Sequence, residues 1–176
     1  MNLSTLYNST QYDHLLTDGN WQKADFYELD TSSSFWNKAI VVALPKKVAK
    51  TTTEALIYAL QKQAKALRIW EAEWKTTTPT LKSFIHFFIA EKGFTNTQGK
   101  PIAIEDFWKK YSATIAGITG EIGFEFTKNN ETIPFFNLLN KKELTQVICF
   151  DDNWEEHNFL VETKTSWVLY HWSSVV

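Results

Sequence analysis

The C-terminal segment 145–172 constrains the fold more than any other part of the chain. It contains three apolar runs rich in β-branched and aromatic residues, separated by two short polar segments. Runs of this length, bounded by Asp, Asn, Lys and Thr, are typical of strands joined by tight turns. The first run is almost continuously apolar, as in a strand covered on both faces. We therefore predict a three-stranded antiparallel meander with strands at 146–150, 157–163 and 167–172.

The register of the last two strands follows from the length of the turn between them. A two-residue turn at 164–165 places Glu162 opposite Trp167. The face predicted to be core then carries His157, Phe159, Val161, Val168, Tyr170 and Trp172. The other face mixes Asn158, Leu160, Glu162, Trp167, Leu169 and His171, which favours a partly exposed recognition surface. A slip of one residue would exchange the two faces, and the turn lacks the Asn-Gly or Asp-Gly pair that would exclude it.

Charge is unevenly distributed along the chain. From Glu143 to the end there are six acidic residues and one Lys, a net charge of −5, whereas the preceding part carries 14 acidic and 17 basic residues, a net charge of +3. One interpretation is a solvated turn with exposed glutamates. The other is an acidic patch with aromatic anchors that binds a basic protein partner, since opposite charge speeds association and Trp supplies contact area. The candidate partner-binding residues are Asp151, Asp152, Glu155, Glu156, Glu162, Trp167 and His171.

Size and composition favour a single globular domain spanning residues 1–176. The net charge of −2 gives no general attraction to nucleic acid, and Arg68 is the only Arg, which argues against sequence-specific DNA recognition. No signal-peptide pattern and no apolar run of about 18 residues is present, so we expect a soluble, cytoplasmic protein with no membrane contact. Cys149 stands alone in an apolar run and is interpreted as a small buried residue in a reducing compartment.

The N-terminal half predicts short helices, one strand and one long helix. Residues 3–16 and 21–29 fit short helices only roughly. The apolar run within 35–44 is stopped by Pro45 and favours a strand. Thr51 followed by Glu54 is a capping box, and the apolar spacing after it predicts a helix over 52–75.

Two more helices and two strands are predicted in the following part. Thr78-Pro79 is a typical helix start, with Gly93 at the C-terminal cap. A third helix is expected over 103–116, ended by Gly117. Residues 121–127 alternate as in an amphipathic strand, and 132–136 can return as an edge strand. The predicted fold class is thus α+β: a single domain with three longer central helices and a mostly antiparallel sheet ending in the C-terminal meander.

No segment carries a recognisable catalytic or cofactor motif. The glycine-rich segment 117–123 follows a helix and precedes a strand, the reverse of a phosphate-binding loop, and favours a tight turn. The acidic run 151–156 with His157 and His171 does not match a calcium loop, so no metal site is assigned. We predict no catalytic residue and no cofactor, although catalytic groups from distant segments would leave no local motif.

Two stretches resemble the porphyrin-binding magnesium-chelatase accessory family of the genomes-uncoupled type. The first contains Tyr12, Leu15, Leu16, Trp21, Ala24 and Asp25, and the second runs over 104–112 with Gly120, Gly123 and Phe124. The resemblance implies a helical domain and a tetrapyrrole ligand. In that family the stretches lie closer together and the chain does not end in strands, so no binding residue is carried over.

The sequence leaves three hypotheses for the function. The first is a non-catalytic protein-binding module, such as a cytoplasmic immunity or inhibitor protein that uses its acidic, aromatic C-terminal sheet. The second is a small-ligand protein, with a tetrapyrrole as one candidate, using an aromatic pocket between helices and sheet. The third is an enzyme without a local sequence signature. The oligomeric state stays open.

Overall fold

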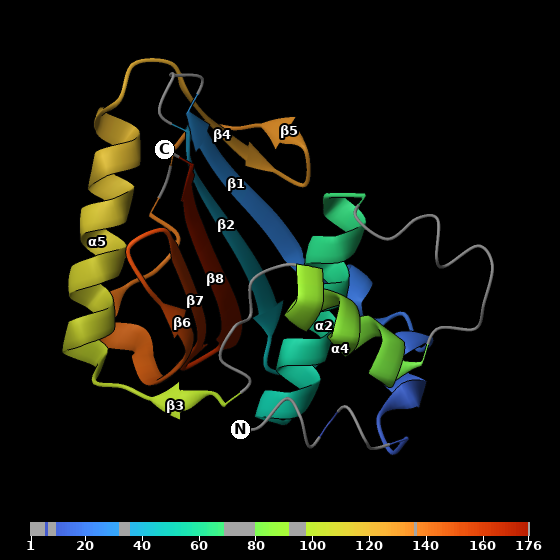
Figure 1. Ribbon diagram of the computed structural model, residues 1–176. Helices are drawn as coiled ribbons and strands as arrows, with labels where there is room; N and C mark the ends of the chain where they lie inside the picture. Colours follow the sequence, from blue (N-terminus) through green and yellow to red (C-terminus); the bar gives the residue numbers. More distant parts are fainter. Residues whose placement is uncertain are drawn as a thin grey trace.

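The computed structural model has an antiparallel β-sheet at its centre and helices on both faces (Figure 1). It describes residue 6 and residues 10–31, 36–68, 80–91, 98–135 and 137–175. The helix expected over 3–16 lies partly outside these residues, and the Thr78-Pro79 start and the Gly93 cap lie wholly outside them. The helix expected over 52–75 ends at Ala66, because residues 67 and 68 form a turn, and residues 69–75 lie outside the described part.

Eight strands form one sheet within the described residues, in the order β3-β6-β7-β8-β2-β1-β4-β5, and all neighbouring strands are antiparallel. The two edge strands contain two residues each, which leaves little unpaired backbone for another chain to pair with. The strands are β1 (Asp25–Thr31), β2 (Trp36–Pro45), β3 (Lys100–Pro101), β4 (Phe124–Lys128), β5 (Glu131–Thr132), β6 (Leu144–Asp152), β7 (Glu156–Thr163) and β8 (Ser166–Val175).

The helices divide between the two faces of the sheet. Helices α2 (Thr52–Ala66) and α4 (Leu81–Glu91) cover one face, and α5 (Ile104–Gly120) covers the other (Figure 1). Short 3₁₀ helices η1 (Asp13–Leu16) and η2 (Asn20–Lys23) precede β1, and η3 (Lys141–Glu143) precedes β6. The predicted layer of three longer central helices is not confirmed, because the sheet occupies the centre.

Two hydrophobic cores result from this arrangement, one on each face of the sheet. Along β2, Ile40 and Val42 pack toward α2 and α4, whereas Ala39 and Val41 pack toward α5. The core under α5 is aromatic: the Phe107 ring meets Phe159 edge-on at 5.2 Å between centroids. Each such pair contributes about 0.5–1.5 kcal/mol beyond its buried area. The central strands are therefore covered on both faces.

Several local predictions are confirmed. β7 and β8 pair with Glu162 opposite Trp167 and Asn158 opposite His171, as the two-residue turn requires. Thr51 and Glu54 form the predicted capping box at the start of α2. The apolar run ending at Pro45 is strand β2.

Other local predictions are wrong. Residues 21–29 do not form a helix: η2 ends at Lys23 and β1 begins at Asp25. Helix α5 continues through Gly117 to Gly120. The helical domain that the resemblance implies is also wrong, because its first stretch spans η1, η2 and the start of β1.

Two glycines, one tightly packed and one in open space, allow this fold to be tested by substitution. A Cβ at Gly99 would lie 2.6 Å from Ile148 Cγ2, so we expect Gly99→Ala to destabilise the protein by about 1–3 kcal/mol. A Cβ at Gly117 meets nothing within 4 Å, so Gly117→Ala is expected to stabilise α5 by roughly 0.5–1 kcal/mol. Urea unfolding measures both changes. Destabilisation by Gly117→Ala would mean that the helix ends where the sequence suggested.

Candidate functional site

The structure divides the seven predicted partner-binding residues between the two ends of the β7–β8 hairpin. Glu162 and Trp167 lie at the β7–β8 turn. The other five residues lie at or next to the β6–β7 turn; they are Asp151, Asp152, Glu155, Glu156 and His171. Five residues of extended strand lie between Glu156 and Glu162, which places the two residues about 20 Å apart. The predicted set is therefore not one patch.

At the β7–β8 turn, Trp167 is a core residue. Its side chain is 7% exposed, and its indole Nε1 donates a hydrogen bond to the Ala49 carbonyl at 3.0 Å. Lys46 Nζ lies 5.6 Å from the centre of the Trp167 ring and 2.6 Å from Glu162 Oε1. Leu160 and Leu169 on the same face are also buried. The prediction that this face is a partly exposed recognition surface is therefore wrong for most of the face, because the core under α2 and α4 covers it.

A half-buried polar cluster occupies the other end of that face. Glu156 Oε1 accepts a hydrogen bond from Asn158 Nδ2 at 2.8 Å, and Asn158 Oδ1 lies 2.7 Å from His171 Nδ1. Asn158 is fully buried, and Asp151 nearly so. Burial raises the pKa of Glu156; the hydrogen bond from Asn158 lowers it, and the charge of Asp151 raises it further. The cluster therefore holds its acidic charge away from solvent.

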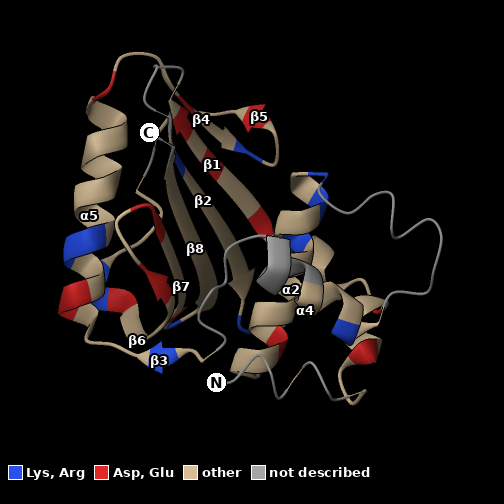
Figure 2. Ribbon diagram, in the orientation of Figure 1, with Lys and Arg blue, Asp and Glu red and all other residues tan. Residues whose placement is uncertain are grey.

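The neighbouring Asp152 points to the opposite face, where α5 lies. Its Oδ1 is 2.8 Å from Lys110 Nζ and 3.5 Å from His157 Nε2. Burial lowers the pKa of His157, and the charge of Asp152 opposes this. A hollow of about 470 Å³ beside α5 has Asp152, Lys110, Asp106 and Lys109 in its walls. Acidic and basic segments thus lie together around α5 and the β6–β7 turn (Figure 2).

The β6–β7 turn exposes a tryptophan that the sequence analysis did not select. The side chain of Trp154 is 73% exposed between the acidic residues Asp152 and Glu155. Asn153 Oδ1 accepts hydrogen bonds from the backbone amides of Glu155 and Glu156, both at 2.8 Å. The Glu155 carbonyl also accepts from the amide of Ser174 at 2.9 Å. The turn is therefore tied to its own strands. The position of the tryptophan within a run of Asp, Asn and Glu is the sequence signal that could have predicted its exposure.

The remaining candidates for chemistry are structural in this fold. Burial raises the pKa of the Cys149 thiol to about 11, so the thiol is protonated at neutral pH. Gly117 and Gly120 lie in α5, so they do not form a loop. Within the described part of the chain, no group of three or more His, Cys, Asp or Glu side chains is arranged to hold a metal ion.

These features define an α+β protein with an antiparallel sheet between two helical layers. Comparisons with protein-family models, with curated proteins and with solved structures found no match. Among the described helices, none is long and apolar enough to span a membrane.

The raised pKa of Glu156 predicts a pH-dependent effect of neutralising it. The folded chain holds this proton more tightly than the unfolded chain, so the contribution of Glu156 to stability falls as pH rises through its raised pKa. We expect Glu156→Gln to raise the free energy of unfolding at pH 7 and to change it little at pH 4. The Gln side chain retains an acceptor for Asn158 Nδ2.

Urea unfolding at the two pH values measures this difference. Glu155→Gln is the matched control, because Glu155 is exposed and its neutralisation should change stability by less than about 0.5 kcal/mol. If Glu156→Gln destabilised the protein more at pH 7 than at pH 4, the ionised carboxylate would be stabilising the cluster with Asn158 and His171.

Proposed function

We propose that the protein is a non-catalytic protein-binding module that presents the β6–β7 turn to a basic protein partner. The single observation that carries this proposal is the exposure of Trp154 on a turn whose backbone is held by its own hydrogen bonds. A large aromatic side chain buries extensive apolar area on binding, and Trp is enriched among the residues that dominate binding energy. Because the turn is already ordered, less conformational entropy is lost on association.

The charges around Trp154 indicate the kind of partner. Asp152 and Glu155 are exposed acidic residues on either side of the tryptophan in the sequence, and Lys110 pairs with Asp152. An acidic rim around an apolar anchor suits a partner with an apolar pocket edged by Lys or Arg. Such charges act mainly on the association rate and its dependence on salt. A cytoplasmic inhibitor or immunity protein for a basic toxin is the concrete form of this proposal.

The binding surface differs from the one expected from the sequence. Asp152 and Glu155 stay in it, Glu156 is bound within the half-buried cluster, and Trp154 replaces Trp167 as the aromatic anchor. Glu162 lies at the far end of the hairpin and is paired with Lys46. The hollow beside α5 adjoins Asp152 and gives the surface a concave part next to its projecting turn.

Affinity capture with matched variants tests the proposal. Wild-type protein and Trp154→Ala are immobilised in parallel, exposed to a lysate of the source organism, and analysed by mass spectrometry. We expect a stoichiometric basic protein on the wild type, with affinity about thirtyfold lower for Trp154→Ala.

The control variant is Ile122→Ala, which removes a 94% exposed apolar side chain beyond the end of α5 and should leave the partner bound. Glu155→Gln should slow association and weaken its salt dependence. Equal retention by wild type and Trp154→Ala would remove the turn from the interface, and a partner that is not basic would refute the electrostatic part of the proposal.

A further inference from the structure

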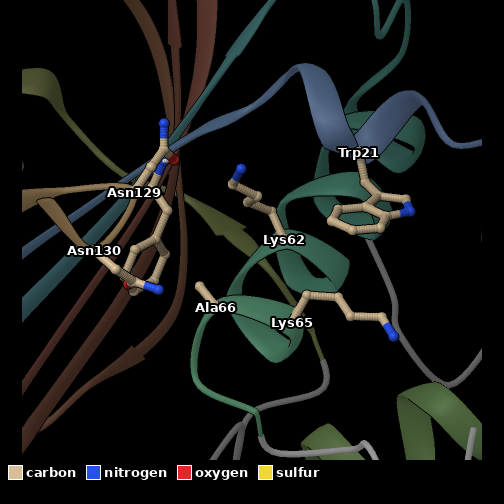
Figure 3. Close-up of a pocket in the computed structure, with 7 residues that line it drawn as sticks. Trp21, Lys62, Lys65, Ala66, Asn129 and Asn130 are labelled. Atoms are coloured by element: carbon tan, nitrogen blue, oxygen red, sulfur yellow. Dashed lines mark hydrogen bonds between the residues drawn. The ribbon is translucent and has the colours of Figure 1, made fainter.

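A cavity of about 210 Å³ lies between α2, the η2 turn and the turn that joins β4 to β5. The residues that line it are Trp21, Lys62, Lys65, Ala66, Asn129 and Asn130, together with Phe26, whose side chain is fully buried. Figure 3 shows Lys62 rising from α2 between the two asparagines on one side and Trp21 on the other. No residue in these walls is acidic. The cavity thus combines the aromatic surface of Trp21, two asparagine side chains and two lysines.

Both walls of the cavity are fixed by contacts to the rest of the fold. Asn129 forms two hydrogen bonds to Phe26 of β1. Its backbone N–H donates to the Phe26 carbonyl at 2.7 Å, and its side-chain Oδ1 accepts from the Phe26 backbone N–H at 3.0 Å. On the other side, the Tyr58 hydroxyl of α2 donates to Asp18, which in turn accepts from the Asn20 amide at 2.9 Å. This network holds η2, and with it Trp21, against α2. The cavity is therefore preformed.

The ammonium group of Lys62 is available to a ligand. No carboxylate of the described residues lies within ion-pair distance of it. The charge of Asp25 raises the pKa of Lys62, but the Asp25 carboxylate is already paired with Lys128 at 3.0 Å. Burial lowers the pKa of Lys62, which means that the charged amine lacks full solvation. A bound anion would supply the missing partner.

Asn130 offers a second polar group on the same side. Both turn residues adopt left-handed backbone conformations, with φ of 50° at Asn129 and 70° at Asn130. The side chain of Asn129 is used in binding β1. That of Asn130 makes no hydrogen bond to any described residue and borders the cavity. Its amide can therefore donate to an oxygen that also contacts Lys62.

We propose that this cavity binds a small organic anion, with a carboxylate or phosphate at Lys62 and Asn130 and a planar apolar body against Trp21. Lys binds such groups as a point charge, and charged hydrogen bonds in a partly dry site are stronger than neutral ones. The volume is below the roughly 300–1,000 Å³ of sites for drug-sized ligands. It suits one ring with one anionic substituent and excludes a tetrapyrrole from this cavity.

Calorimetric titration with four probes tests the proposal and separates the two anion types. The probes are benzoate, phenyl phosphate, inorganic phosphate and the neutral analogue benzamide. We expect saturable binding of benzoate or phenyl phosphate below about 10 mM, with benzamide and inorganic phosphate each at least about tenfold weaker. Binding of benzoate alone would assign a carboxylate ligand, and binding of phenyl phosphate alone a phosphorylated one.

Variants then connect the binding to the cavity. Lys62→Met keeps the aliphatic stem, removes the charge and should weaken binding roughly tenfold to a hundredfold. Lys47→Met, which removes an exposed cation after β2, is the matched control and should bind as the wild type does. Asn130→Gly tolerates the left-handed backbone and should weaken binding roughly two- to tenfold, which provides a second test if Lys62→Met unfolds.

Several results would overturn the proposal. Failure of both aromatic anions to bind the wild type would remove the site. If Lys62→Met and Asn130→Gly both bound the anion as the wild type does, the binding site would lie outside this cavity. Equal binding of benzamide and benzoate would refute the anionic requirement, and equal binding of inorganic phosphate and phenyl phosphate would refute the contribution of Trp21.

Discussion

The fold depends on the burial of the central strands on both faces. Strands β2, β7 and β8 alternate between a core under α2 and α4 and a core under α5, so most residues in the middle of these strands are apolar and buried. Buried strands of this kind leave no room for exposed polar chemistry along their length. Polar side chains collect where strands end and helices no longer cover them. Both the Trp154 turn and the Lys62 cavity lie in such places.

Features governed by neighbouring residues were predictable from the sequence. The hairpin register follows from a two-residue turn, and the start of α2 follows from the reciprocal hydrogen bonds of Thr51 and Glu54. Residues 21–29 were assigned to a helix because a strand buried on both faces lacks the alternation that identifies strands. Phe26 and Tyr27 point into different cores, so consecutive apolar residues resemble a rough helical pattern. Only the positions of the two helical layers distinguish a strand that is buried on both faces from a helix with the same apolar pattern.

The candidate site was less predictable, because exposure and charge depend on distant segments. The polar residues around Trp154 are a local sign of its exposure, but the burial of Trp167 comes from the core that covers the start of β8. Likewise, the C-terminal acidic excess is reduced by Lys46 and Lys110, which belong to elements far away in the sequence. The acidic end of the sheet is visible in the sequence, whereas the tertiary structure determines which of its residues reach solvent.

The strand order places the two proposed sites near opposite edges of the sheet. β6 lies next to edge strand β3 and β7 follows it, whereas β4 and β5 lie at the other edge. About four to five strand spacings of roughly 4.8 Å, or about 20 Å, separate the two turns across the sheet. Substitutions at this distance, without shared partners, usually act additively. Trp154→Ala should therefore leave anion binding intact, and Lys62→Met should leave protein capture intact. A change in both activities from either variant would instead indicate that the sheet transmits a structural change between its edges.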